Sequence, residues 1–234
     1  MQPTTTYRAV YQLYTSFLDW TQGSLRDLAY AIVCPPPKVV ATGNGALAFS
    51  THLPIHCIDW PLRPGSRKRL DILLSVEETI DIESGHYTWV RVRLNYLRKK
   101  ATGLKAVESL RYDCEIPARS QHPLYHAQTS DELVAPLPES LVSEVDRSPI
   151  QTRHDRIRIP SAFVNLPAVL AILASDHLNE EHWQDFMPSL VERCEHFPRV
   201  PEPTLVSRLR DQAIPGAWHW YELGAASSAS KRSA

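Results

Sequence analysis

The chain has 234 residues, 43% of them hydrophobic and 22% charged, which is the composition of a globular protein with a core that needs neither disulfides nor metals. Its formal net charge of −1 excludes a strong overall attraction to nucleic acid or membranes, so such contacts must rest on local patches. The sequence also has no apolar run long enough for a membrane span and no secretory signal, so we expect a cytoplasmic protein without membrane contact.

The first predicted elements are helices within residues 1–33. Apolar side chains at helical spacing, among them Val10, Leu13 and Phe17, predict a helix over about residues 5–20. Gly23 interrupts the pattern, and a second, shorter helix is predicted to follow it. The run of three prolines after Cys34 ends this helical part.

A sheet is predicted over residues 39–130. Two strands are expected on either side of the turn Gly43–Gly45, and three runs with strict alternation of apolar and polar side chains follow from Leu70 to Ile116. Short turns separate these runs, which favours consecutive antiparallel strands.

The last part of the chain is predicted to be mostly helical. Residues 134–151 are rich in proline and serine and are expected to form a loop, followed by a short edge strand that Pro160 ends. Residues 157–224 are predicted to be a helical C-terminal part, in which Asn165 is the N-cap of the first helix and a terminal aromatic segment comes last. Residues 225–234 are predicted to be a disordered tail.

These elements predict the α+β class, with a central antiparallel β-meander, N-terminal helices, and C-terminal helices packed on one face. Residues 1–224 are expected to form a single domain, although the helical C-terminal part could instead be a small second lobe. The expected core places sheet residues against helical ones: Ile72, Leu74, Val90, Val92, Leu94, Leu110 and Tyr112 against Leu170, Leu173 and Trp183.

The candidate functional residues are Arg111, Asp113, His122 and His126. In a strand, Arg111 and Asp113 point to the same face, because they are two residues apart. His122 and His126 are four residues apart, which puts them on one face of either a strand or a helix. We expect the two pairs to meet in one polar site at the edge of the sheet.

Arg91 and Arg93 occupy the polar positions of the preceding strand. If these positions share a face with Arg111 and Asp113, the polar side of the meander carries three arginines and an aspartate. Gln128 joins the histidines only if their segment is a strand.

Several chemistries fit this site. Two histidines and an arginine suit cleavage of a phosphodiester, with one histidine as base, the other as acid, and the arginine stabilising the developing charge. Both histidines with Asp113 could instead bind a divalent metal. The arginines could also hold phosphate without catalysis. In the simplest alternative, Arg111 and Asp113 form a cross-strand ion pair and the histidines pack at the sheet edge.

A second polar cluster comprises Asp176, His177, Glu181 and His182. His177 and Glu181 have a spacing that metal ligands use on a helix, but helix capping and solvation are the favoured interpretation. The four cysteines are scattered without a CxxC pair, which argues against a zinc knuckle and indicates reduced thiols.

The segment from Arg111 to Gln128, with its Arg-Tyr-Asp strand and its proline-adjacent His-x-x-x-His, resembles a group of uncharacterised bacterial toxin-like and defence-associated proteins. The resemblance covers the middle third of the chain. It implies action on RNA or neutralisation by a partner protein, and it points to Arg111, Asp113, His122 and His126.

The leading hypothesis is therefore a bacterial cytoplasmic protein of toxin or defence type that contacts or cleaves RNA or DNA through a polar sheet-edge site. The alternative is a non-enzymatic module that binds another protein, as a partner or as a subunit of a larger complex. The sequence identifies no cofactor, and whether the protein is an enzyme stays open at this point.

Overall fold

The structure is a computed structural model that describes residues 6–27, 31–32, 36–60, 68–100, 103–115, 125–129, 133, 145–146, 148, 159–161, 163–178 and 180–199. Its helices are α1 (Tyr7–Asp27), α3 (Leu166–His177) and α4 (Glu180–Cys194). Its strands are β1 (Ala31–Ile32), β2 (Lys38–Ala41), β3 (Ala46–Trp60), β4 (Lys68–Asp81), β5 (Tyr87–Lys100), β6 (Gly103–Glu115), β7 (Tyr125–Thr129), β8 (Val145–Asp146) and β9 (Ile159–Pro160).

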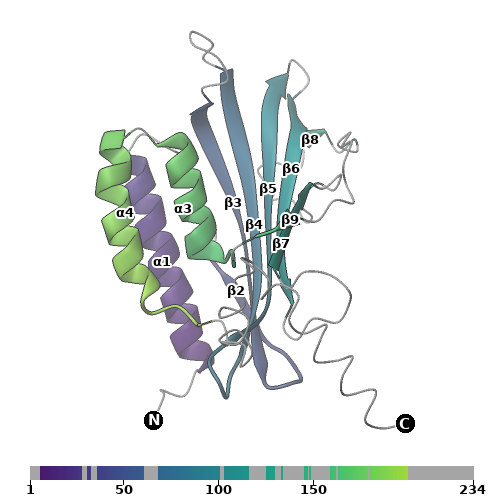
Figure 1. Cartoon of the computed structure of the whole chain (residues 1–234), viewed down its shortest axis with the longest axis vertical. Helices are drawn as coiled ribbons and strands as arrows, with labels where there is room; N and C mark the ends of the chain where they lie inside the picture. The colour runs from purple at the N-terminus through teal and green to yellow at the C-terminus, as the bar shows by residue number, and fades with distance from the viewer. Residues whose placement is uncertain are drawn as a thin grey trace, which may run out of the picture.

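The strands form one sheet in the order β1-β3-β4-β5-β6-β7-β9. Strand β2 also pairs with β3, and β8 pairs with β6 in the only parallel pairing among the described strands. The helices α1, α3 and α4 all lie on the same side of the sheet (Figure 1). The α+β class, the antiparallel meander and the packing of helices on one face are therefore confirmed.

The long strands β4, β5 and β6 lie where the alternating runs predict them and pair antiparallel throughout. Turns with glycines at positive φ, Gly85 and Gly103, fit the connections between these strands, because glycine adopts that conformation without a steric penalty. The prediction of three consecutive antiparallel strands is thus confirmed for the described residues.

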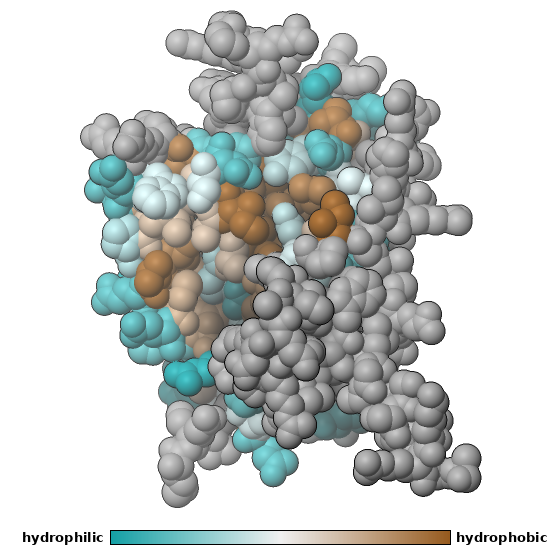
Figure 2. All heavy atoms as spheres, viewed as in Figure 1, coloured by the Kyte–Doolittle hydropathy of each residue, from teal (hydrophilic) through white to brown (hydrophobic). Residues whose placement is uncertain are grey.

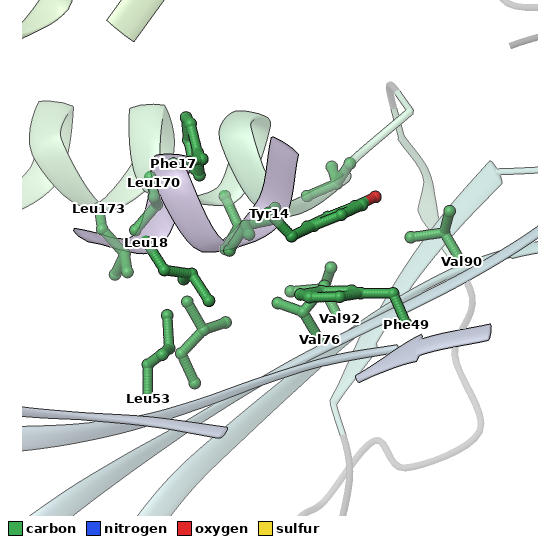
Figure 3. Packing of buried hydrophobic residues seen from close by; sticks show 14 of the residues in the cluster. Tyr14, Phe17, Leu18, Phe49, Leu53, Val76, Val90, Val92, Leu170 and Leu173 are labelled. Atoms are coloured by element: carbon green, nitrogen blue, oxygen red, sulfur yellow. The ribbon is translucent and has the colours of Figure 1, made fainter. Parts of the chain in front are cut away.

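The face of the sheet that the helices cover, called here the inner face, carries the main core. Side chains from β3, β4 and β5 pack against α1 and α3, and the ring of Tyr14 stacks on Phe49 at a centroid distance of 3.7 Å (Figure 3). Of the predicted core, Ile72, Leu74, Val90, Val92, Leu94, Leu170 and Leu173 are buried, and Leu110 and Tyr112 are partly buried.

The opposite face, called here the outer face, is not polar throughout. At one end it carries a second, smaller core of Leu73, Leu97, Leu104, Ala106 and Val145. Leu73 and Leu97 interrupt the polar positions of β4 and β5, so the expectation of a core on one face alone was incomplete. The polar side chains gather toward the other end of β5 and β6.

Two predictions for the N-terminal helices were wrong. Helix α1 continues through Gly23 to Asp27 rather than ending before it. The apolar face that includes Phe17, Leu18 and Leu25 is buried along this whole length, and that burial outweighs the cost of about 1 kcal/mol for a helical glycine. Ala31 and Ile32, expected to be helical, pair with β3 instead.

Trp183 was wrongly assigned to the core. It lies on the outward side of α4 with 38% of its surface exposed, and its indole Nε1 donates to Ser175 Oγ at 3.2 Å. Helix α4 instead buries Phe186 and Leu190, which belong to the same amphipathic stripe. Helix α3 begins as predicted, because the Asn165 side chain accepts a hydrogen bond from the Ala168 backbone N–H.

Several predictions fall wholly or partly outside the described residues. These include the helix and the aromatic segment expected after residue 200, the tail at 225–234, and most of the loop predicted at 134–151. Within that loop, Val145 and Asp146 form β8, so for these two residues the loop prediction was wrong. The edge strand ending at Pro160 is confirmed as β9, the last strand of the sheet order.

Candidate functional site

The candidate site is a charged network around Asp113 on the outer face. Asp113 Oδ1 lies 2.7 Å from Arg91 Nε on β5, and its Oδ2 lies 2.7 Å from Arg111 Nε on β6. His126 Nε2, on β7, is 3.6 Å from the same Oδ2. With its amide oxygen turned toward Arg111, Gln128 accepts from Nε at 3.1 Å and also from Nη2. We call these five residues the Asp113 network.

Strand register brings the network together. Arg91 pairs with Asp113, and Asp113 pairs with His126, so one row of side chains crosses β5, β6 and β7. In the next row, Arg111 pairs with Gln128. Because period two places alternate side chains on one face, all five residues point to the outer face.

Solvent reaches the network only in part. The side chains of Arg91, Arg111 and Asp113 are 31%, 18% and 12% exposed, and His126 and Gln128 are buried. In such surroundings an ion pair is screened less than at the surface, so the network holds its side chains in fixed positions. Both arginines bind Asp113 through Nε, the nitrogen nearest the strand.

Three of the four predicted site residues meet in this network: Arg111, Asp113 and His126. The fourth, His122, lies outside the described residues. Gln128 joins His126 on the same face, which is the outcome expected if the segment is a strand. Arg111 and Asp113 form a pair within one strand, and the cross-strand partner of Asp113 is Arg91.

An aromatic side chain stands beside the network. The guanidinium of Arg91 lies over the ring of Trp89, with Cζ 5.0 Å from the ring centroid. Both side chains are partly exposed and belong to the same face of β5. A cation over an indole face is an attractive contact worth about 0.5–2 kcal/mol, so Trp89 adds a second constraint on the orientation of Arg91.

Sequence reasoning missed a second polar cluster, which lies on the inner face. Glu78 is fully buried and accepts a hydrogen bond from the Tyr14 hydroxyl of α1. Its Oε1 accepts from the Leu166 backbone N–H, at the start of α3, at 2.7 Å. The Tyr87 hydroxyl lies 3.2 Å from that of Tyr14 and accepts from Asn165 Nδ2 at 3.4 Å. This buried cluster joins α1, β4, β5 and α3.

Burial dominates the acid–base properties of this cluster. It raises the pKa of Glu78 to about 7, and the hydrogen bonds from Tyr14 and Leu166 oppose that rise without cancelling it. The pKa values of Tyr14 and Tyr87 are raised well above the usual value, first by burial and then by the charge of Glu78. Glu78 therefore changes charge near neutral pH.

A signal for Glu78 was present in the sequence. The apolar positions of β4 run through Ile72, Leu74, Val76 and Ile80, and Glu78 stands where the next apolar side chain is expected. A carboxylate at a core-facing position must find hydrogen-bond donors, and the N-terminus of a helix supplies them. The break in alternation at this residue was the observation to follow.

The helical side of the molecule carries an open groove of about 600 Å³ between α3 and α4. Its walls are largely apolar and include Ala168, Ala171, Met187, Leu190 and Val191. Figure 2 shows apolar side chains gathered where these two helices lie. Nothing in the described residues indicates what would cover this groove.

The described residues contain no group of three or more His, Cys, Asp and Glu side chains arranged to hold a metal ion. In the second predicted cluster, Asp176 is exposed and His177 lines a small apolar cavity between α3, α4 and the sheet, while the Glu181 side chain lies outside the described residues. Cys114 and Cys194 form no disulfide within the described part of the chain. None of the described helices is long and apolar enough to cross a membrane.

Comparisons of this chain with protein-family models, with curated proteins and with solved structures found no match.

Proposed function

We propose that the Asp113 network binds nucleic acid, with Arg91 and Arg111 contacting phosphate groups. The observation that carries this proposal is that one carboxylate holds both arginines through their Nε atoms, each at 2.7 Å. An arginine held at Nε loses little conformational entropy when its terminal nitrogens bind a ligand. Planar guanidinium groups bind phosphate oxygens in a bidentate manner, so prepositioned arginines favour a phosphate ligand.

The local charge supports the same ligand. In the two neighbouring rows that hold the Asp113 network, three arginines, Arg91, Arg93 and Arg111, stand against the two carboxylates of Glu77 and Asp113, in a chain whose formal net charge is −1. The positive excess is therefore local, as a phosphate site in a near-neutral protein requires.

Cleavage is the second part of the proposal, with His126 as the general acid or base. Asp113 Oδ2 lies 3.6 Å from His126 Nε2, close enough to orient the imidazole. Arg111, on the same carboxylate oxygen, would stabilise the charge that develops on phosphorus. The second histidine that such a reaction uses would be His122, as the sequence pattern suggests.

The test uses the purified full chain with pools of labelled RNA and DNA, each with and without a chelator. Arg111→Gln should weaken binding at least about ten-fold, because it removes a charged hydrogen-bond donor. Arg98→Gln is the matched control, since Arg98 is an exposed arginine on β5 that makes no contact with the Asp113 network. Equal loss in both variants would contradict a site at Asp113.

The cleavage arm compares wild type with His126→Ala. Products that persist in chelator and disappear in His126→Ala support acid–base chemistry, and products lost in chelator alone support a metal. Binding without products in any condition contradicts the cleavage part and keeps the binding part.

We further propose that this activity serves a toxin or defence role in the bacterial cytoplasm, as the sequence resemblance implies. Expression of the wild type should then slow bacterial growth, and Arg111→Gln should relieve the effect at equal protein level. Normal growth with both proteins would contradict this role. No binding of any nucleic acid, together with stable capture of a defined protein partner, would favour the alternative of a non-enzymatic interaction module.

A further inference from the structure

The positive charge of the outer face extends beyond the Asp113 network. Arg93 on β5 pairs directly with Arg111 on β6, and on its other side with Ser75 on β4. Ser75 in turn pairs with His52 on β3. A row of side chains thus continues from Gln128 across five neighbouring strands, which spans about 19 Å at the usual strand spacing.

Two arginines directly opposite each other on neighbouring strands repel, and such pairs are destabilising. Asp113 offsets the charge of Arg111, and Glu77 lies in the adjacent row beside Arg93. On β3, burial lowers the pKa of His52; the charge of Glu77 opposes this shift, and the charge of Arg93 adds to it. Arg93 and Arg111 therefore lie side by side on β5 and β6, and these two arginines are called here the strip.

The strip also has a surface on which a base can stack. The Trp89 ring and the Arg91 guanidinium lie one above the other at the side of the strip, and both remain partly exposed. Unpaired bases stack on aromatic rings and on guanidinium planes, whereas the bases of a duplex already stack on each other. A broad sheet face also lacks the narrow shape that enters a duplex groove.

We propose that the ligand is a single strand of nucleic acid that lies across β6 and β5, with its phosphates on Arg111 and Arg93 and one base on the Trp89–Arg91 pair. This inference rests on the proposed function, because it names the class of nucleic acid that the same face binds. Arg93 and Trp89 thereby become binding residues beside Arg111.

The experiment measures binding by fluorescence anisotropy with three labelled probes: a 12-nucleotide single-stranded RNA, the DNA strand of the same sequence, and the DNA duplex. Each titration is repeated over a series of salt concentrations. The variants are Arg93→Gln and Trp89→Leu, with Arg98→Gln as control on the same strand. Thermal unfolding of each variant is recorded, and Trp89→Phe serves as the variant that restores an aromatic ring.

Single strands should bind at least about ten-fold more tightly than the duplex. Arg93→Gln should reduce the slope of log K against log salt by about 0.7, the value for one phosphate contact on a single strand. Trp89→Leu should weaken single-strand binding by roughly ten-fold, Trp89→Phe should restore most of it, and Arg98→Gln should change neither quantity.

Tighter binding of RNA than of DNA, or equal binding of both, supports the inference, and the difference reports contacts to the 2′-hydroxyl. Equal affinity for duplex and single strand, or an unchanged salt slope in folded Arg93→Gln, overturns the inference and leaves the proposed function in place. Absence of binding to all three probes overturns both.

Discussion

Glu78 and Asp113 are carboxylates on opposite faces of the same sheet, and their partners differ in kind. Glu78 is buried on the inner face between two tyrosine hydroxyls and the first backbone N–H of α3. Asp113 lies on the outer face between Arg91 and Arg111, with His126 beside it. Among the described residues, no cation contacts Glu78, whereas cations surround Asp113.

The difference separates a structural role from a binding role. Neutral donors and a helix N-terminus satisfy Glu78 and fix α1 and α3 on the sheet, so its titration acts on folding. Asp113 instead orients the side chains of Arg91 and Arg111, which remain partly exposed. A carboxylate that holds arginines on a partly exposed face is the better candidate for a ligand site. The predictions below test this division, beginning with the inner core.

The largest effect is expected from Leu94→Ala on the inner face. Leu94 is fully buried, and its truncation should lower the free energy of unfolding by about 2–5 kcal/mol. Val107→Ala on β6 is the control, because Val107 is 38% exposed and should change stability by less than about 1 kcal/mol. Urea unfolding measures both. Similar midpoints for the two variants would mean that the faces of the sheet are assigned the wrong way round.

The second prediction concerns Glu78 and pH. Its pKa is 4.5 in an ordinary setting and about 7 in the folded protein, so between these values the folded state binds a proton that the unfolded state has lost. Stability should therefore fall as the pH rises from about 4.5 to 7, by roughly 3 kcal/mol at about 1.4 kcal/mol for each pKa unit. Below this window, Glu78 is protonated in both states and contributes no pH dependence.

Glu78→Gln provides the control, because the amide is nearly the same shape and does not titrate. Urea unfolding at pH 5 and pH 8 should show that the difference in stability between wild type and variant shifts by about 2–3 kcal/mol in favour of the variant at the higher pH. Parallel behaviour of the two proteins would place the pH dependence elsewhere and remove Glu78 as the titrating group.

The same two residues show what the sequence could and could not predict. The strands were predictable because alternation is local, and Arg111, Asp113 and His126 were found because period two fixes their face. Glu78 was missed although it breaks the alternation of β4. A lone glutamate in a strand is usually a surface residue, and the helix N-terminus that donates a hydrogen bond to Glu78 is known only from the fold. Arg91 became the cross-strand partner of Asp113 only through register, which depends on pairing between distant segments.

The sequence predictions for Gly23 and Trp183 were wrong for a related reason, because both depend on packing between distant segments. Gly23 has the local character of a helix break, but the apolar face on both sides of it packs on the sheet and keeps α1 continuous. Trp183 fits the helical spacing of Phe186 and Leu190, but 38% of its surface is exposed and its indole N–H donates to Ser175 Oγ. Tertiary packing decided both cases, and no local pattern contains it.

The third prediction returns to the outer face. Asp113→Asn keeps the shape of the side chain but removes the charge between Arg91 and Arg111, so the two guanidinium groups repel without compensation. We expect a loss of about 1–3 kcal/mol in the free energy of unfolding, and a smaller loss at high salt. The double variant Asp113→Asn with Arg91→Gln should recover part of the loss, because it removes one of the two positive charges that repel. A double-mutant cycle measures this coupling. Additive losses would contradict the network.

The smallest effect is expected at the cap of α3. Asn165→Ala removes the acceptor for the Ala168 backbone N–H and should cost about 1 kcal/mol, measured by urea unfolding. Asn165→Ser keeps a capping oxygen and should cost less. Equal losses in both variants would mean that the contact with Tyr87, rather than the cap, is what Asn165 contributes.

Asn165→Asp sharpens the comparison between the two faces. Aspartate caps a helix as well as asparagine does, so the cap itself should survive. The new charge, however, would stand next to Leu166, whose N–H binds Glu78, and like charges disfavour each other's ionised forms. The pKa of Glu78 should rise further, and the fall in stability should extend to a higher pH than in the wild type. An unchanged pH dependence in folded Asn165→Asp would contradict an electrostatic coupling between the start of α3 and the ionisation of Glu78.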